Sequence, residues 1–209
     1  MVDYGELFDF PYQAAALYDG AWGNAILSRF PIAKSEEMHI YNRSGPDRAD
    51  RPGPTAASRS PPIIRIRPLS RQQGARFRAH ADRRDRPLIL CGDLNCINPD
   101  DKIDRSRLVT SFRAFTSNAE IAVDRLIESG RMVFGALGEL GLRDAIPPAG
   151  RRYSIRPTWP NADKGSGVRI DHILVNAAIE VAAGEVVHSP ASNLASDHHP
   201  VMIEFRLRG

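Results

Sequence analysis

The most constraining stretch of the sequence is an unbroken apolar run that ends in a polar turn, residues 87–95 (PLILCGDLN). A short apolar run bounded by turn-forming residues is typical of a strand that is buried on both faces of a sheet. Gly92 allows a tight backbone turn where this strand ends. We therefore expect Asp93 and Asn95 at the rim of the sheet, where strand ends present polar groups to ligands. The alternative for Asp93 and Asn95 is that the strand simply ends in an ordinary polar turn.

Two later stretches also place polar groups in or beside expected strands. Residues 168–175 (VRIDHILV) predict a strand that contains Asp171. Residues 201–207 (VMIEFRL) alternate between apolar and polar side chains, which predicts a half-buried strand. Asp197 and His198 come directly before this last strand. The sequence thus predicts several strand ends that carry carboxylate, amide and imidazole groups.

Helices are expected between these strands. Ser117 with Glu120 three residues later matches a capping box, which predicts that a helix begins there. We expect Gly130 to interrupt this helix and Gly141 to end a second helical stretch. Residues 96–105 are polar and predict a surface loop.

An atypical segment lies at residues 43–70, where six prolines occur among arginine, serine and glycine. This composition favours a loop or disorder over a packed element. Residues 43–86 hold 12 arginines and 4 aspartates, a net charge of +8, whereas the rest of the chain carries −5. The overall charge of +3 therefore does not indicate a nucleic-acid-binding domain. We hypothesise that a shifted reading frame has replaced the original sequence of 43–70.

Length and composition bound the class of protein. A chain of 209 residues predicts a single domain, 1–209, and we expect a monomer. No apolar run approaches the roughly 20 residues that span a bilayer, and no signal peptide is visible. Cys91 and Cys96 fit no zinc-binding spacing, and Cys91 lies in the strand expected to be buried. Two free thiols predict a reducing compartment, the cytoplasm.

The polar residues at the strand ends share one chemistry. Carboxylates and amides suit hard divalent cations such as Mg²⁺ or Mn²⁺. An aspartate can orient or deprotonate water. An aspartate beside a histidine can fix its tautomer, so that the histidine acts as a base or stabilises a charged oxygen. The set fits metal-assisted hydrolysis of a phosphate ester. Its members are Asp93, Asn95, Asp171, Asp197 and His198.

Structural roles are the alternatives for these residues. Asp171 could instead form an ion pair with an arginine such as Arg169, and His198 with His199 could belong to a plain polar loop. Trp159 could belong to the core or contact the substrate, as could Tyr153.

Four segments in this order resemble the endonuclease/exonuclease/phosphatase superfamily, which includes DNase-I-like nucleases, exonuclease-III-like repair enzymes, inositol phosphatases and sphingomyelinases. The resemblance implies an α+β fold, a four-layer α/β/β/α sandwich, and divalent-metal-dependent attack of water on phosphorus. The segments are 23–32, 92–95 (GDLN), 169–174 (RIDHIL) and 196–200 (SDHHP).

The resemblance also implies a role for each site residue. Asp93 would activate the water and bind the metal, and Asn95 would contact the scissile phosphate. Asp171 would lie near the phosphate and metal, and Asp197 would lie close to the metal. His198 would act as the base or stabilise the transition state.

The chain departs from the family pattern at its start. Family members begin with a strand that carries an asparagine and continue to a strand that ends in a metal-binding glutamate. This chain resembles a member that lacks those first strands, so we expect weak metal binding and impaired activity. We predict a divalent-metal-dependent phosphodiester hydrolase, nuclease- or phosphatase-like, with Trp159 as a candidate substrate contact. The alternatives are a non-catalytic remnant, or a phosphate- or nucleic-acid-binding module that uses residues 43–70.

Overall fold

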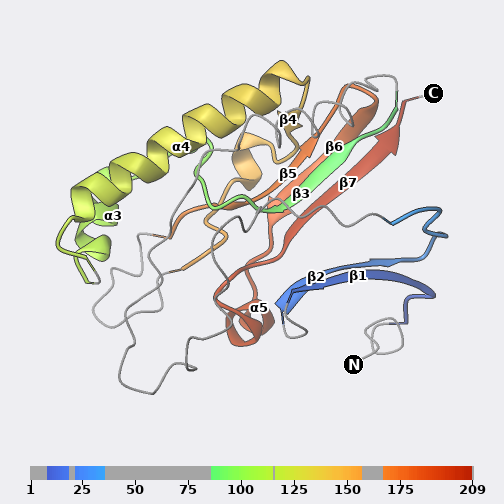
Figure 1. Cartoon of the computed structure of the whole chain (residues 1–209), viewed down its shortest axis with the longest axis horizontal. Helices are drawn as coiled ribbons and strands as arrows, with labels where there is room; N and C mark the ends of the chain where they lie inside the picture. The colour runs from blue at the N-terminus through green and yellow to red at the C-terminus, as the bar shows by residue number, and fades with distance from the viewer. Residues whose placement is uncertain (1–8, 19–21, 36–85, 115, 157–166, 209) are drawn as a thin grey trace, which may run out of the picture. The chain divides into compact units, whose positions relative to one another are not determined.

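The computed structural model divides the chain into two compact units, Met1–Thr55 and Ala56–Gly209, each described by itself (Figure 1). In the first unit, β1 (Tyr12–Tyr18) pairs with β2 (Trp22–Ser28) as an antiparallel hairpin. The guanidinium carbon of Arg29 lies 5.8 Å from the ring centre of Phe10. The structure describes residues 9–18, 22–35, 86–114, 116–156 and 167–208.

The described residues of the second unit form two antiparallel sheets. The first has the strand order β3-β5-β4, where β3 is Ile89–Asp93, β4 is Arg143–Asp144 and β5 is Asp171–Val175. The second consists of β6 (Ile179–Val186) and β7 (Val201–Leu207), with a register shift in β6. The bounds of β7 are those expected from the alternating pattern.

Strand β5 separates two hydrophobic clusters because its side chains alternate between the two faces of the sheet. Leu174 packs with α4 (Ala119–Glu139), whereas Ile173 and Val175 pack with apolar residues of β6 and β7. Within this unit, α4, the sheet of β3, β5 and β4, and the β6–β7 pair are therefore successive layers (Figure 1). The mixture of helices and antiparallel sheets confirms the expected α+β class.

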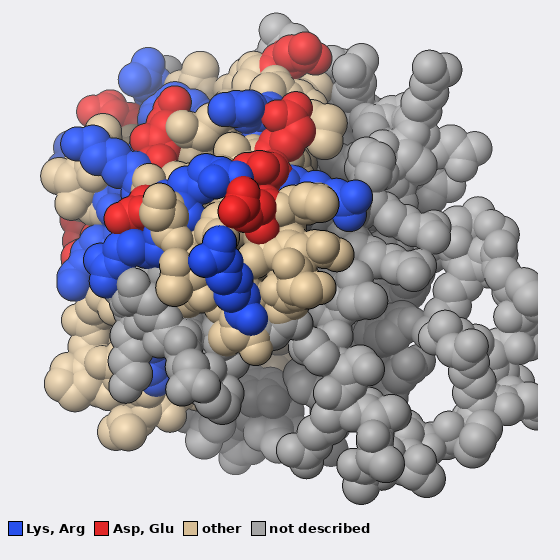
Figure 2. Space-filling view, turned by 90° about the vertical axis from the view of Figure 1, so that its left-hand side faces the viewer, with Lys and Arg blue, Asp and Glu red and all other residues tan. Residues whose placement is uncertain are grey.

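Helix α3 (Arg105–Phe112) packs beside α4. Its N-cap is Asp104, whose side chain accepts a hydrogen bond from the backbone N–H of Arg107. On the surface, Arg105 forms a bidentate pair with Asp124 of α4, at 2.9 and 3.0 Å. Figure 2 shows basic and acidic side chains interspersed on the face drawn there. The described part of that face is therefore not a continuous basic surface.

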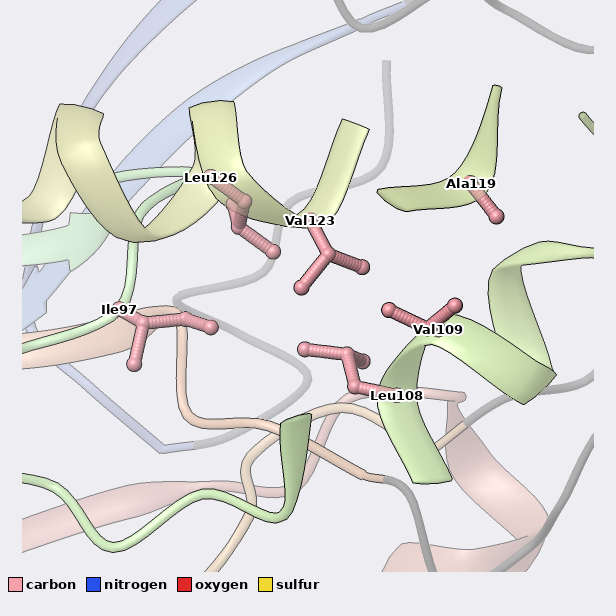
Figure 3. Packing of buried hydrophobic residues seen from close by; sticks show 6 residues of the cluster. All are labelled: Ile97, Leu108, Val109, Ala119, Val123 and Leu126. Carbon is pink, nitrogen blue, oxygen red and sulfur yellow. The ribbon is translucent and has the colours of Figure 1, made fainter. Parts of the chain in front are cut away.

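The interior of the α3–α4 pair is apolar, and its side chains converge in Figure 3. Ile97, from the loop after β3, enters this cluster and meets α4 beside Gly130. A Cβ atom on Gly130 would lie 1.8 Å from the carbonyl oxygen of Ile97. The cluster consists of Ile97, Leu108, Val109, Ala119, Val123 and Leu126.

The structure corrects two expectations about α4 and confirms one. The helix runs without interruption through Gly130, because that glycine accommodates the backbone of Ile97. The N-cap is Asn118, with no side-chain capping hydrogen bond, so the capping box expected from Ser117 and Glu120 is wrong. Gly141 follows the helix with φ +78°, as expected for a residue that ends a helix.

Strand β3 is less buried than its apolar sequence predicts. Ile89 is 39% exposed and Cys91 is also exposed, because β3 is an edge strand among the described strands and has β5 as its neighbour. Cys96 is the buried cysteine. The apolar end of β7 was also expected to be half-buried, but Phe205 and Leu207 are 43% and 62% exposed.

The loop after β3 was expected on the surface, yet Cys96, Ile97 and Asn98 are buried. The reason is that the loop passes under α4 and beside β5. The remaining elements are a short 3-10 helix, η2 (Pro148–Gly150), and α5 (Pro190–Ala195). Within the described residues, no helix has the length and apolarity to cross a bilayer. The predictions for 43–70 and for Trp159 fall outside the described residues.

Candidate active site

Two carboxylates lie opposite each other at one end of the β3–β5 pair. Asp93 is the last residue of β3, Asp171 is the first of β5, and the two are partners in the register. Directly opposite residues project from the same face of a sheet. Asp171 shares its face with Ile173, which packs toward β6 and β7. The two side chains therefore converge on the face away from α4.

Asn95 is tied to Asp93 by a tight polar turn. The Oδ1 atom of Asp93 accepts the backbone N–H of Asn95 at 2.7 Å, and Oδ2 accepts its side-chain amide at 3.1 Å. Asn95 has φ +49°, a left-handed conformation that asparagine adopts more readily than most residues. One hydrogen of the amide group is used in this turn, so the second can point to a ligand.

His198 reaches the same place from the segment before β7. Its backbone forms an antiparallel bridge with Ile155, and its N–H donates to the hydroxyl of Ser196 at 3.1 Å. The Nδ1 atom of His198 lies 2.8 Å from Oδ2 of Asp171. An ionised carboxylate only accepts hydrogen bonds, so Nδ1 carries the hydrogen and Nε2 is the basic nitrogen of neutral His198.

Burial and the charges of the site shift the pKa values of both Asp93 and His198. Partial burial raises the pKa of Asp93, and the charge of Asp171 adds to the rise, while hydrogen bonds from Asn95 and the charge of His198 oppose it. Burial by itself lowers the pKa of His198. The hydrogen bond to Asp171 and the charges of Asp171, Asp197 and Asp93 outweigh burial, and the net pKa of His198 is raised. The site therefore holds concentrated negative charge that favours bound cations.

The carboxylate that holds His198 comes from β5, although Asp197 is its neighbour in sequence. Asp197 is exposed, and its backbone oxygen accepts the N–H of Arg156 at 3.3 Å. The alternative role for Asp171, a pair with Arg169, is wrong. Arg169 is buried and its guanidinium pairs with Asp101 and Asp144 instead. The structure thus brings Asp93, Asn95, Asp171 and His198 together through direct contacts and the β3–β5 register.

Sequence reasoning missed two groups that support the site. Ser154 is fully buried, and its hydroxyl contacts the carboxylate of Asp171 at 2.7 Å. Arg169 links Asp101, in the loop after β3, to Asp144 of β4. No local pattern reveals either group, because Ser154 lies in an irregular stretch and the charges of the Arg169 pairs come from distant segments.

The donor set partly fits a hard divalent cation. Carboxylate oxygens are of the type that Mg²⁺ and Mn²⁺ prefer: those of Asp93 and Asp171 lie on one face of the sheet, and Asp197 adjoins His198 in the sequence. In the part of the chain that is described, no group of three or more His, Cys, Asp or Glu side chains is arranged to hold a metal. These residues therefore supply part of a ligand set.

Comparisons with known proteins show which family this chain is similar to. A model described as Endonuclease/Exonuclease/phosphatase family matches residues 3–198. Among solved structures, a 3′-5′ exonuclease from Neisseria meningitidis is 25% identical, with a TM-score of 0.42. The similarity covers 64% of this chain and 52% of the exonuclease, so this chain spans about half the length of that structure. A comparison with curated proteins gives no match. The family assignment rests on the match over residues 3–198.

Proposed function

The chain belongs to the endonuclease/exonuclease/phosphatase family, and from that premise we propose that it is a divalent-metal-dependent phosphodiester hydrolase. The observation that supports this proposal best is the 2.8 Å contact between His198 and Asp171, with Asp93 opposite Asp171 in the sheet. An imidazole held by one carboxylate beside a second carboxylate is suited to moving a proton during attack on phosphorus.

Each residue has a distinct task in this proposal. Asp93 orients the attacking water, and Nε2 of His198 takes up a proton or donates a hydrogen bond to the charged phosphoryl oxygen. The free amide hydrogen of Asn95 stabilises another phosphoryl oxygen, and Asp171 keeps the imidazole in the required tautomer. Asp93 and Asp197 would hold Mg²⁺ or Mn²⁺, which polarises the phosphoryl group when it is bound.

We propose that the activity is nuclease- or phosphatase-like. Nucleic acid is the first candidate substrate, and Trp159 is a candidate contact for the substrate. Figure 2 gives no separate support for a nucleic-acid-binding module, because basic and acidic side chains are interspersed on the described part of the face it shows. Two free cysteines, of which Cys91 is exposed, fit our further proposal of a reducing, cytoplasmic location.

Hydrolysis of bis(p-nitrophenyl) phosphate by the purified chain tests this function. We expect turnover with Mg²⁺ or Mn²⁺ that EDTA abolishes. Asp93→Asn and His198→Gln should each reduce turnover by at least about 100-fold. The matched controls are Asp100→Asn, an exposed carboxylate in the following turn, and His188→Gln.

The controls should retain most of the activity, since Asp100 is exposed and Nε2 of His188 is bonded to the carbonyl oxygen of Tyr153. Turnover that survives EDTA, or that survives His198→Gln, would contradict the mechanism. A folded chain without turnover on this diester and on single-stranded DNA, even at high metal concentration, would identify a non-catalytic remnant.

A further inference from the structure

We propose that Ser154 is a positioning residue that fixes the carboxylate of Asp171 and thereby the imidazole of His198. This inference rests on the proposed function for its catalytic consequence. Its structural part, a fixed relay of hydrogen bonds from Ser154 to His198, can be tested separately.

The hydroxyl of Ser154 has one possible direction for its hydrogen. A serine hydroxyl carries one donor hydrogen and two acceptor lone pairs. The backbone N–H groups of Ile170 and Asp171 both donate to Oγ of Ser154, each at 3.0 Å. These two bonds occupy the acceptor side, so the hydrogen points to Oδ2 of Asp171 at 2.7 Å. The backbone thus sets the direction in which Ser154 donates.

The same carboxylate oxygen receives both bonds of the relay. Oδ2 of Asp171 accepts from Ser154 at 2.7 Å and lies 2.8 Å from Nδ1 of His198. A partial rotation of the carboxylate about its terminal bond would move Oδ2 away from both Ser154 and His198 and would break both contacts. The bond from Ser154 opposes that rotation and keeps Oδ2 in place to accept the hydrogen of His198. Ser154 therefore keeps Nδ1 as the donor and Nε2 as the base.

The main chain of Ser154 also connects the two segments that carry the pair. Its N–H donates to the carbonyl of Val168, before β5, at 3.0 Å. Its carbonyl accepts the N–H of His199 at 2.6 Å. The next residue, Ile155, bridges to both Val168 and His198. Because Ser154 is fully buried and anchored at both sides, its hydroxyl is a rigid reference point for Asp171.

A double-mutant cycle tests the catalytic consequence. We expect Ser154→Ala to lower kcat about 10- to 100-fold with little change in KM, as for other residues that orient a functional side chain. In the Asp171→Asn background the same change should have little further effect, because the path to His198 is already altered. Equal losses in both backgrounds would overturn the proposal.

Ser129→Ala is the matched control. Ser129 is also buried, and its hydroxyl donates to a carbonyl within α4, that of Leu126, at 2.8 Å. The Ser129→Ala substitution should leave kcat unchanged although it removes a buried serine hydroxyl. Ser154→Thr keeps the hydroxyl and should restore kcat relative to Ser154→Ala. All variants are assayed at least 10 °C below their melting temperatures, so that loss of folding does not enter the comparison.

A second readout does not depend on turnover. Nitrogen-15 NMR of the imidazoles, with His198 assigned by its loss in His198→Gln, reports which ring nitrogen carries the hydrogen. At a pH high enough to keep His198 neutral, we expect one tautomer in the wild type, with the hydrogen on Nδ1. In Ser154→Ala we expect a mixture, and in Ser129→Ala no change. An unchanged spectrum in folded Ser154→Ala would refute the relay even if the enzyme were active. Absence of turnover with the expected spectra would refute the proposed function and leave the relay intact.

Discussion

Replacing Gly130 by alanine tests the contact between α4 and the loop that leaves the site. The substitution removes a glycine from a helix interior, which by itself stabilises a helix by about 1 kcal/mol. Here the added Cβ would lie 1.8 Å from the carbonyl oxygen of Ile97, a backbone atom. Carbon and oxygen atoms pack at about 3.5 Å, so the loop has to move by more than ~1 Å.

The expected result follows from these opposing contributions. Overpacking of a filled interior costs typically about 1–3 kcal/mol, and displaced backbone places Gly130→Ala at the upper end of that range. The net change should be a destabilisation of about 2 kcal/mol. In the same helix, Gly135 has no atom within 4 Å of an added Cβ, so Gly135→Ala should stabilise the protein by about 1 kcal/mol.

Urea unfolding followed by circular dichroism at 222 nm measures both variants. The difference of about 3 kcal/mol between them corresponds to melting temperatures that differ by roughly 6–12 °C for a chain of this size. Gly130→Ala should also lower kcat, because Ile97 lies two residues after Asn95. Equal stability of Gly130→Ala and Gly135→Ala would refute the close contact.

Two further predictions concern the buried ion pairs of Arg169. Arg169→Met leaves the buried carboxylates of Asp101 and Asp144 without their main partner, and should cost about 3–5 kcal/mol in urea unfolding, whereas Arg131→Met, which removes an exposed pair, should cost less than ~1 kcal/mol. Similar costs for both would show that the buried pairs contribute little. Burial raises the pKa of Asp144, but hydrogen bonds and charge from Arg169 outweigh it and the net pKa is lowered. The contribution of this pairing to the free energy of unfolding is therefore complete above the ordinary aspartate pKa of about 3.9, and it is lost as the pH falls below that value. The difference in unfolding free energy between wild type and Asp144→Asn should therefore narrow below about pH 4. A difference that stays constant from pH 6 to pH 3 would contradict the lowered pKa.

Much of the site could be predicted from the sequence because its residues adjoin strands with clear local patterns. The alternation over 201–207 marks β7, and the apolar run before Gly92 marks β3. Antiparallel pairing of β3 with β5 places Asp93 opposite Asp171, and His198, just before β7, reaches Asp171 through its side chain. Short-range pattern is sufficient for such residues, since the strand defines where the polar group must be.

Burial and helix boundaries were harder to predict, because they depend on neighbours that a local pattern does not contain. The apolar sequence of β3 suggests a strand covered on both faces, whereas its described neighbour is β5 alone. Ser117 has the residue type of an N-cap, yet the helix begins one residue later, after Asn118. Gly130 has the residue type of a helix breaker, and its actual role depends on a carbonyl from another segment. In each case tertiary contact overrides local preference.

The residues that hold the site in place are less visible in the sequence than the residues that form it. After Asn95 the chain is fixed at three successive points. Cys96 accepts a hydrogen bond from His172 of β5 at 3.0 Å, since its backbone carbonyl can only accept, and Ile97 packs into the α3–α4 cluster. Asn98 donates to Asp144 at 2.7 Å. Each contact joins segments that are distant in sequence, so no spacing rule could have linked them. A motif search therefore finds the polar residues of this candidate site, while their positions depend on ordinary buried residues such as Ile97 and Ser154. If the proposed function holds, substituting these buried residues should weaken catalysis although they do not contact the substrate.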